Sequence, residues 1–173
     1  GKLPKPSLII VIGIGGSNLG AMAVHGAVCA RLACAQEKFP QMLFADSVDP
    51  ILISGIIFCA KRHLEQGRHV LLNIVSKSGQ TVETIANFDA IHSSLSKAGG
   101  NLHVVFTCDQ NSTFEKIASE EGFATLPIPL SVGGRYSVFS NAGVFPLALS
   151  GIDVNLLLDG AQAMLSKCLS HDL

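Results

Sequence analysis

The sequence predicts an α/β fold: a five-stranded parallel sheet with helices on both faces. Short aliphatic runs alternate with segments of helical periodicity along all 173 residues, and this alternation is typical of strand–helix–strand crossovers. Apolar residues make up 48% of the chain, charged residues 14%, and Trp is absent. A core of aliphatic side chains favours strands that are buried on both faces, as parallel strands are.

Each predicted strand is a short apolar run that ends at turn residues. The first run is rich in β-branched side chains and stops at Gly13, and the third stops at Ser76. Such runs, bounded by Gly, Ser, Asp or Pro, indicate buried strands. The predicted strands occupy residues 7–12, 42–45, 70–75, 102–106 and 123–128.

Residues typical of helix termini flank the predicted helices. Asp49 and Pro50 suit a helix start, because Pro needs no amide partner in the first turn. Gly99 and Gly100 suit a helix end, because glycine readily adopts the left-handed conformation that closes a helix. The predicted helices occupy residues 17–34, 50–66, 81–98, 113–121, 136–149 and 154–169.

The charge balance argues against two classes of partner. The net charge is −1, and no cluster of basic residues exceeds the pair Lys61 and Arg62. We therefore expect no binding to nucleic acid and none to a membrane surface. The small charged fraction also predicts that some apolar surface is covered by a partner subunit or by polypeptide that this chain lacks.

The cysteines and histidines show no metal-ligand spacing. The cysteines are odd in number, lie mostly in apolar runs and form no C-x-x-C pair, so we predict buried, reduced thiols. Neither a signal peptide nor an apolar span of about 18 residues is present, which favours the cytoplasm. The chain starts without Met, and we expect residues 1–173 to be a single domain of a longer protein. The cysteines are Cys29, Cys34, Cys59, Cys108 and Cys168.

The densest polar stretch, residues 76–81, follows the third predicted strand. Its sequence Ser-Lys-Ser-Gly-Gln-Thr combines three hydroxyls and one ammonium group directly before a helix. The first amides of a helix have no backbone partner, so a phosphate could bind there, with hydroxyls donating and Lys77 supplying charge. The alternative is a helix cap without a ligand, since Thr81 is a good N-cap residue.

Sheet topology predicts that a second loop lies beside this one. In the strand order 2-1-3-4-5 the ligand crevice lies between the first and third strands, which brings residues 13–18 next to residues 76–81. This proximity favours the phosphate site over the helix cap. Because Gly16 has no side chain, ligand oxygens could approach its backbone and the Ser17 hydroxyl.

Residues 13–18 match no nucleotide-binding motif well. Asn18 stands at the third glycine position of the dinucleotide fingerprint, so a nicotinamide cofactor is a weak alternative. Ala21 and Met22 stand where a P-loop requires Lys and Ser or Thr, which excludes an NTPase. Arg135 follows two glycines at another strand end; a surface charge is the usual role of Arg, but this position favours a role in the site.

Three stretches together resemble the phosphoglucose isomerase family. They are residues 12–20, 76–84, and 132–138 with 148–153. The resemblance extends over essentially the whole chain and implies the first sugar isomerase (SIS) domain of a two-domain enzyme, with a flavodoxin-like strand order. It implies a homodimer that interconverts glucose 6-phosphate and fructose 6-phosphate in glycolysis and gluconeogenesis, without a metal or an organic cofactor.

The resemblance also implies a role for individual residues. Arg135 would be the catalytic cation that stabilises a cis-enediolate. The hydroxyls of residues 76–81, with Lys77 close by, would hold the phosphate of a hexose 6-phosphate, and the glycines would contact the sugar. Gly79 and Gln80 depart from the loop found in many members. The substrate-binding residues implied are Gly16, Ser17, Ser76, Lys77, Ser78, Thr81 and Gly134.

The resemblance implies only half of an active site in this chain. The family's glutamate base, its ring-opening histidine and a further lysine lie in sequence that the chain does not contain, so we expect no isomerase activity from it alone. The alternative is a non-catalytic SIS module that senses a sugar phosphate. Arg135 favours the isomerase, because a sensor has no enediolate to stabilise.

Overall fold

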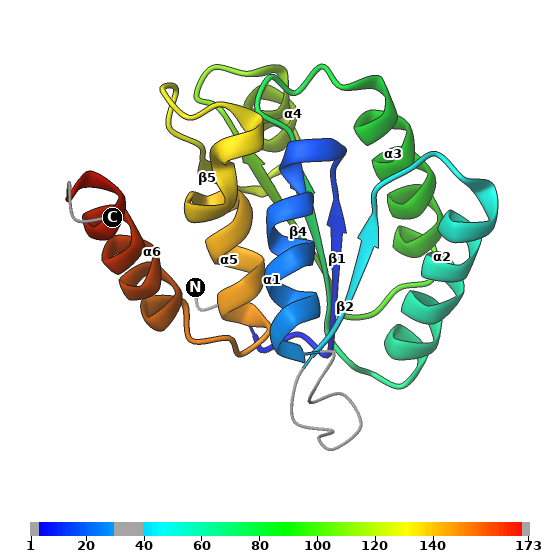
Figure 1. The fold of residues 1–173 in the computed structure, drawn as a ribbon. Coiled ribbons are helices and arrows are strands. Elements are labelled where there is room, and N and C mark those ends of the chain that lie inside the picture. The colour runs from blue at the N-terminus through cyan, green and yellow to red at the C-terminus, as the bar shows by residue number, and fades with distance from the viewer. Residues whose placement is uncertain (1–3, 30–39, 171–173) are drawn as a thin grey trace.

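Five parallel strands form one sheet in the computed structural model, which describes residues 4–29 and 40–170 (Figure 1). Their order is β2-β1-β3-β4-β5, so the predicted fold class and strand order are confirmed. Every predicted strand is present, with ends that differ by at most two residues. The strands are Leu8–Ile12 (β1), Gln41–Ala45 (β2), Val70–Val75 (β3), Leu102–Cys108 (β4) and Ala124–Pro127 (β5).

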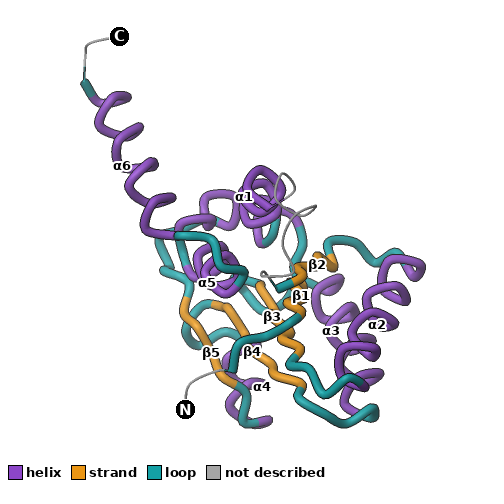
Figure 2. Tube along the Cα trace, turned by 90° about the horizontal axis from the view of Figure 1, so that it is seen from below, coloured by secondary structure: helices purple, strands orange, loops and turns teal. Residues whose placement is uncertain are grey.

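Helices cover both faces of this sheet. Figures 1 and 2 show α1 and α5 on one face and α2, α3 and α4 on the other. Two short 3₁₀ helices, η1 and η2, lie in the connections. The helices are η1 (Gly15–Ser17), α1 (Leu19–Cys29), α2 (Pro50–Glu65), α3 (Val82–Ser96), α4 (Thr113–Glu121), η2 (Gly134–Phe139), α5 (Asn141–Leu149) and α6 (Val154–Leu169).

The two central strands are buried along their whole length. In β1, Ile10 lies in register with Leu43 of β2 and Leu72 of β3. Because successive side chains of a strand point to opposite faces, Ile10 packs in the core shared with α2, α3 and α4, while Ile9 and Val11 pack in the core shared with α5. Burial on both faces explains why β1 is an unbroken aliphatic run and why β3 is aliphatic apart from Asn73.

Two predicted helices differ from the structure. The helix predicted at residues 17–34 begins as η1 and continues as α1, and its predicted end lies outside the described residues. The prediction of a single helix at residues 136–149 is wrong, because the chain forms η2 and then α5. Ser140 between them is extended, and its Oγ accepts a hydrogen bond from the Ala142 amide. A capping serine therefore starts a new helix inside an apolar stretch.

The last helix, α6, extends away from the rest of the fold (Figure 2). None of its residues is buried, and Leu156, Met164, Leu165 and Leu169 are exposed. Part of the exposed apolar surface that the composition predicts lies here. The expectation that other polypeptide covers this surface stays a prediction.

The prediction of buried cysteines is wrong for most of the described ones. Cys108 is buried at the end of β4, whereas Cys29 and Cys59 are partly exposed and Cys168 is exposed. Cys168 is exposed because it belongs to α6, which has little to pack against. All four are free thiols, and the position of Cys34 lies outside the described residues.

Three histidines gather at the amino-terminal edge of the sheet. The Ser7 hydroxyl lies 2.8 Å from His63 Nδ1, and His69 Nδ1 lies 3.0 Å from His103 Nε2. Burial lowers the pKa of His63, with the charges of two neighbouring arginines adding to the effect. Burial, and then the charge of His69, lower the pKa of His103.

The close approach of η1 and η2 depends on Gly16. A Cβ atom at Gly16 would lie 2.6 Å from the amide nitrogen of Arg135 and 2.6 Å from the carbonyl of Gly134. The Ser137 hydroxyl lies 3.2 Å from the Gly16 carbonyl oxygen and 2.7 Å from that of Gly134. The space that a side chain would occupy is thus filled by the backbone of η2, where the sequence suggested an approach for ligand oxygens.

We expect the free energy of unfolding to decrease as the pH falls below 6.5, the ordinary pKa of histidine. The folded state lowers the pKa of His63 and His103, so the unfolded chain binds protons more readily, and the stability these groups contribute is lost below that pH. Denaturant unfolding between about pH 5 and 8 measures the decrease. It should be shallower in the double variant His63→Gln/His103→Gln; an equal decrease in both proteins would contradict the prediction.

Gly16→Ala should destabilise the fold by roughly 1 to 3 kcal/mol, because the added methyl group overlaps backbone atoms that cannot rotate away. Gly26→Ala is a matched control, since Gly26 lies in α1 and a methyl group added there would meet no other part of the fold within 4 Å. That control should stabilise by about 0.5 to 1 kcal/mol. Equal stability of the two variants in thermal unfolding would show that the contact at Gly16 can relax.

Candidate functional site

Loops that follow β1, β3 and β5 meet at the carboxyl edge of the sheet. Ile12 of β1 lies in register with Ile74 of β3, so the loops that leave these two strands start side by side. The first of these loops contains η1, which contacts η2 through Gly16. The stretches that the sequence singles out therefore share one edge of the fold, where ligands bind in open α/β sheets.

In the β3–α3 loop, residues 76–81, backbone amides donate to serine hydroxyls. Ser76 is buried, and its Oγ accepts a hydrogen bond from the Gly79 amide at 3.2 Å and lies 3.2 Å from Thr81 Oγ1. The exposed Ser78 hydroxyl accepts from the amide two residues later at 3.2 Å. Gly79 has a φ of 67°, and a side chain there would overlap the backbone of α4. This glycine lets the loop turn tightly.

The start of α3 differs from the start of the other capped helices. Thr81 is its N-cap residue but makes no side-chain bond to a helix amide, whereas Asp49, Ser112, Ser140 and Asp153 cap α2, α4, α5 and α6 with their side chains. Thr81 therefore occupies the N-cap position, as the alternative of a helix cap expected, but its hydroxyl does not cap the helix. The first amides of α3 remain without a side-chain partner, next to a row of hydroxyls.

Lys77 points to the segment that follows β5. Its Nζ donates hydrogen bonds to the carbonyl oxygens of Leu130 at 2.7 Å and Val132 at 2.9 Å. Burial raises the pKa of the nearby Asp109 carboxyl, and the charge of Lys77 opposes that rise. The sequence contains no hint of these bonds, because the partners are carbonyl groups more than 50 residues away.

Gly134 and Arg135 form the first turn of η2, after Gly133 as N-cap residue. Both are exposed. Within residues 4–29 and 40–170, no hydrogen bond or ion pair engages the Arg135 guanidinium, so its charge is available to a ligand. Ser17 is half-buried in η1, one residue after the glycine that η2 contacts.

Two buried asparagines near this edge have unpaired polar atoms. Asn18 is 1% exposed, and neither atom of its side-chain amide has a partner. Its Oδ1 lies 3.4 Å from where a Cβ of Gly13 would be. Asn73 in β3 accepts a hydrogen bond from the Thr107 hydroxyl at 2.8 Å, and its Nδ2 is unpaired. Neither residue was predicted to belong to the site, although a polar residue inside the apolar run of β3 is a visible signal.

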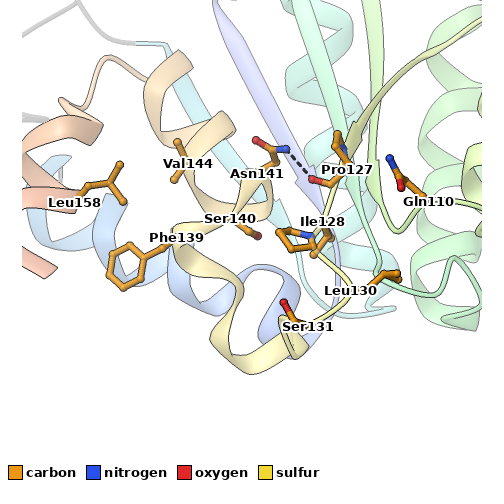
Figure 3. Close-up of a pocket in the computed structure, with 11 residues that line it drawn as sticks. Gln110, Pro127, Ile128, Leu130, Ser131, Phe139, Ser140, Asn141, Val144 and Leu158 are labelled. Carbon is orange, nitrogen blue, oxygen red and sulfur yellow. Dashed lines mark hydrogen bonds between the residues drawn. The ribbon is translucent and has the colours of Figure 1, made fainter. Parts of the chain in front are cut away.

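A groove of about 720 Å³ lies between the exit of β5 and helices α5 and α6 (Figure 3). Asn141 crosses it at one side, donating from Nδ2 to the Pro127 carbonyl oxygen at 2.7 Å. None of the predicted site residues lines this groove. It shares Leu130 with the segment that Lys77 holds. Its lining residues are Gln110, Pro127, Ile128, Pro129, Leu130, Ser131, Phe139, Ser140, Asn141, Val144 and Leu158.

The part of the chain that the structure describes contains no group of three or more His, Cys, Asp and Glu residues able to hold a metal ion. None of the helices in that part is both long enough and apolar enough to cross a membrane.

Comparison with known proteins identifies the family. Residues 6–171 match the family model described as phosphoglucose isomerase. The chain is 35% identical to the probable glucose-6-phosphate isomerase of Methanococcus maripaludis and 38% identical to the glucose-6-phosphate isomerase of Rubrobacter xylanophilus, over 95% and 87% of its own length. It spans only 36% and 35% of these relatives.

A solved structure of a protein with the same family name resembles the fold of this chain. The crystal structure of a glucose-6-phosphate isomerase from Chlamydia trachomatis superposes with a TM-score of 0.66 at 28% identity, covering 84% of this chain and 26% of that one. Since the family model matches nearly the whole chain, the chain belongs to the phosphoglucose isomerase family, and it spans about a third of the length of the two relatives named above.

Proposed function

We propose that this chain is the sugar-phosphate-binding domain, the first of two, of a glucose-6-phosphate isomerase. The observation that carries this is the start of α3, where helix amides without a side-chain cap adjoin the hydroxyls of Ser76, Ser78 and Thr81. A dianionic phosphate suits such a place, because amide donors, hydroxyl donors and the positive end of the helix dipole all favour it. Lys77 belongs to the same loop, but its Nζ donates to the carbonyl oxygens of Leu130 and Val132.

The sugar would lie between this loop and the two 3₁₀ helices. Ser17, Gly134 and the backbone of Gly16 would contact it, since η1 and η2 meet at the same edge of the sheet; the space beside the Gly16 Cα is itself filled by η2. Arg135 would stabilise the oxyanion of a cis-enediolate as a proton moves between C1 and C2 of glucose 6-phosphate and fructose 6-phosphate. A guanidinium that has no partner among residues 4–29 and 40–170 can serve a charge that develops only in the transition state.

The base for this proton transfer would come from polypeptide outside the chain, because the relatives are nearly three times as long. Glu83, the acid nearest to the loop in sequence, is exposed on the first turn of α3. The whole enzyme would act in the cytoplasm as a homodimer, in glycolysis and gluconeogenesis, with no metal or organic cofactor. The exposed apolar residues of α6 agree with a larger assembly. The relatives bear the names of isomerases, so a sensing module has no support beyond the fold.

Thr81→Val should weaken binding of inorganic phosphate or glucose 6-phosphate to this chain by about 10- to 150-fold, which corresponds to roughly 1.5 to 3 kcal/mol for a hydrogen bond to a charged group. Valine is close to threonine in shape and replaces the hydroxyl with a methyl group, which cannot form a hydrogen bond. Isothermal titration measures the affinity. Thr125→Val, at an exposed position of β5, is the matched control and should bind as the parent does. Unchanged affinity in Thr81→Val would mean that this loop only starts a helix.

The chain alone should show no isomerase activity, and in the full-length protein Arg135→Ala should lower kcat by roughly a hundredfold or more. KM should change less, because the charge that Arg135 stabilises is absent from the bound sugar. A coupled assay, run after removal of host isomerase, measures both proteins, and Arg68→Ala provides a control for the loss of one exposed arginine. Turnover by the chain alone would indicate that one of its own carboxylates acts as the base, and Glu83 would be the first candidate.

A further inference from the structure

We propose that Lys77 is a positioning residue, which ties residues 130–135 to the β3–α3 loop and so sets the place of Arg135. This inference rests on the proposed function for the role of Arg135, but the contacts that carry it are independent of any ligand. Lys77 Nζ donates to Leu130 at 2.7 Å and to Val132 at 2.9 Å. Both lengths are those of charge-assisted hydrogen bonds.

The hydrogen bonds of Lys77 account for most of its donor capacity. An ammonium group has three N–H donors, and two of them are used on carbonyl oxygens. To bind a phosphate with these donors, the side chain would have to release the segment after β5. The same carbonyl oxygens place partial negative charge beside Nζ, so a phosphate bound at Nζ would be repelled by them. The main role of the Lys77 side chain is therefore to hold the segment after β5 rather than to bind phosphate.

The carbonyl of Val132 lies directly before the helix that carries the arginine. Gly133 is the N-cap residue of η2, and its carbonyl oxygen accepts from the Tyr136 amide at 2.9 Å. Val132 itself closes a turn, with its amide donating to the Pro129 carbonyl at 3.0 Å. Holding the Val132 carbonyl thus fixes the direction in which the chain enters η2.

A second contact holds η2 from the other side. The Ser137 hydroxyl lies 3.2 Å from the Gly16 carbonyl oxygen, and the backbone at Gly134 fills the space beside Gly16. Arg135 lies between these two attachments, one to the loop after β1 and one to the loop after β3. An exposed arginine on a short 3₁₀ helix needs such supports, because preorganisation of a charge depends on the rigidity of its backbone.

Backbone hydrogen bonds fix the loop that carries Lys77. The Lys77 carbonyl oxygen accepts from the Asp109 amide at 3.0 Å, and the Ser76 amide donates to the Thr107 carbonyl at 3.1 Å. These bonds join the β3–α3 loop to the end of β4. Lys77 therefore connects a loop that is fixed to the sheet with residues 130–132, which follow the short, largely exposed β5.

The variant Lys77→Met tests the inference, because methionine keeps much of the apolar stem and removes the ammonium group. The fold should survive, since Leu130 is 71% exposed and water can reach its carbonyl once the side chain is gone. Amide hydrogen exchange in residues 130–136 should be at least about threefold faster than in the parent chain. Lys97→Met, at the exposed C-cap of α3, is the matched control and should leave this exchange unchanged.

Binding and turnover separate positioning from phosphate contact. Affinity of Lys77→Met for inorganic phosphate should stay within about threefold of the parent, far from the loss expected for a direct hydrogen bond. In the full-length protein kcat should fall by about tenfold with a smaller change in KM, and Lys77→Arg should restore part of it. Unchanged exchange in residues 130–136 would overturn the inference, as would a phosphate affinity reduced as much as by Thr81→Val. Failure of Thr81→Val to affect binding would instead count against the proposed function alone.

Discussion

The contact between Gly16 and the backbone of η2 is the constraint on which the candidate site depends. It joins the loop after β1 to the segment after β5, although β3 and β4 separate these strands in the sheet. The approach is possible only without a Cβ, since an added methyl group would lie 2.6 Å from backbone atoms, closer than packing tolerates. The Ser137 hydroxyl, beside the carbonyls of Gly16 and Gly134, completes this junction. Arg135 owes its position at the edge of the sheet to it.

The same edge collects features that cost stability. The start of α3 has no side-chain cap, and such caps contribute about 0.5 to 2 kcal/mol elsewhere. Asn18 and Asn73 bury amide atoms without partners, and each such atom carries a desolvation cost of about 1 to 3 kcal/mol. The opposite edge shows the reverse, with Ser7 and the histidines paired. Unsatisfied polar groups concentrated at one edge are typical of a functional site that ligand or water completes.

A second asymmetry concerns what this chain leaves exposed. The cores on the two faces of the sheet bury β1 and β3 completely, yet α6 buries none of its residues. The groove beside Leu158 continues this unburied apolar region toward the exit of β5. The chain spans about a third of the length of the relatives it matches, and the proposed function accordingly assigns the base to polypeptide outside it.

By itself the sequence determined the alternation of strands and helices, because aliphatic periodicity and turn residues are local signals. Three stretches taken together determined the family, and the strand order followed from that resemblance, since local signals do not say which distant strands pair. Tertiary structure alone decided how the side chains are used. Ser140 splits an apolar helix, Cys168 is exposed on α6, and Lys77 bonds to carbonyl groups 53 and 55 residues away. The reason is physical: carbonyl acceptors exist at every residue, so no sequence pattern marks the one that a lysine will reach, and only the packing of distant loops selects it.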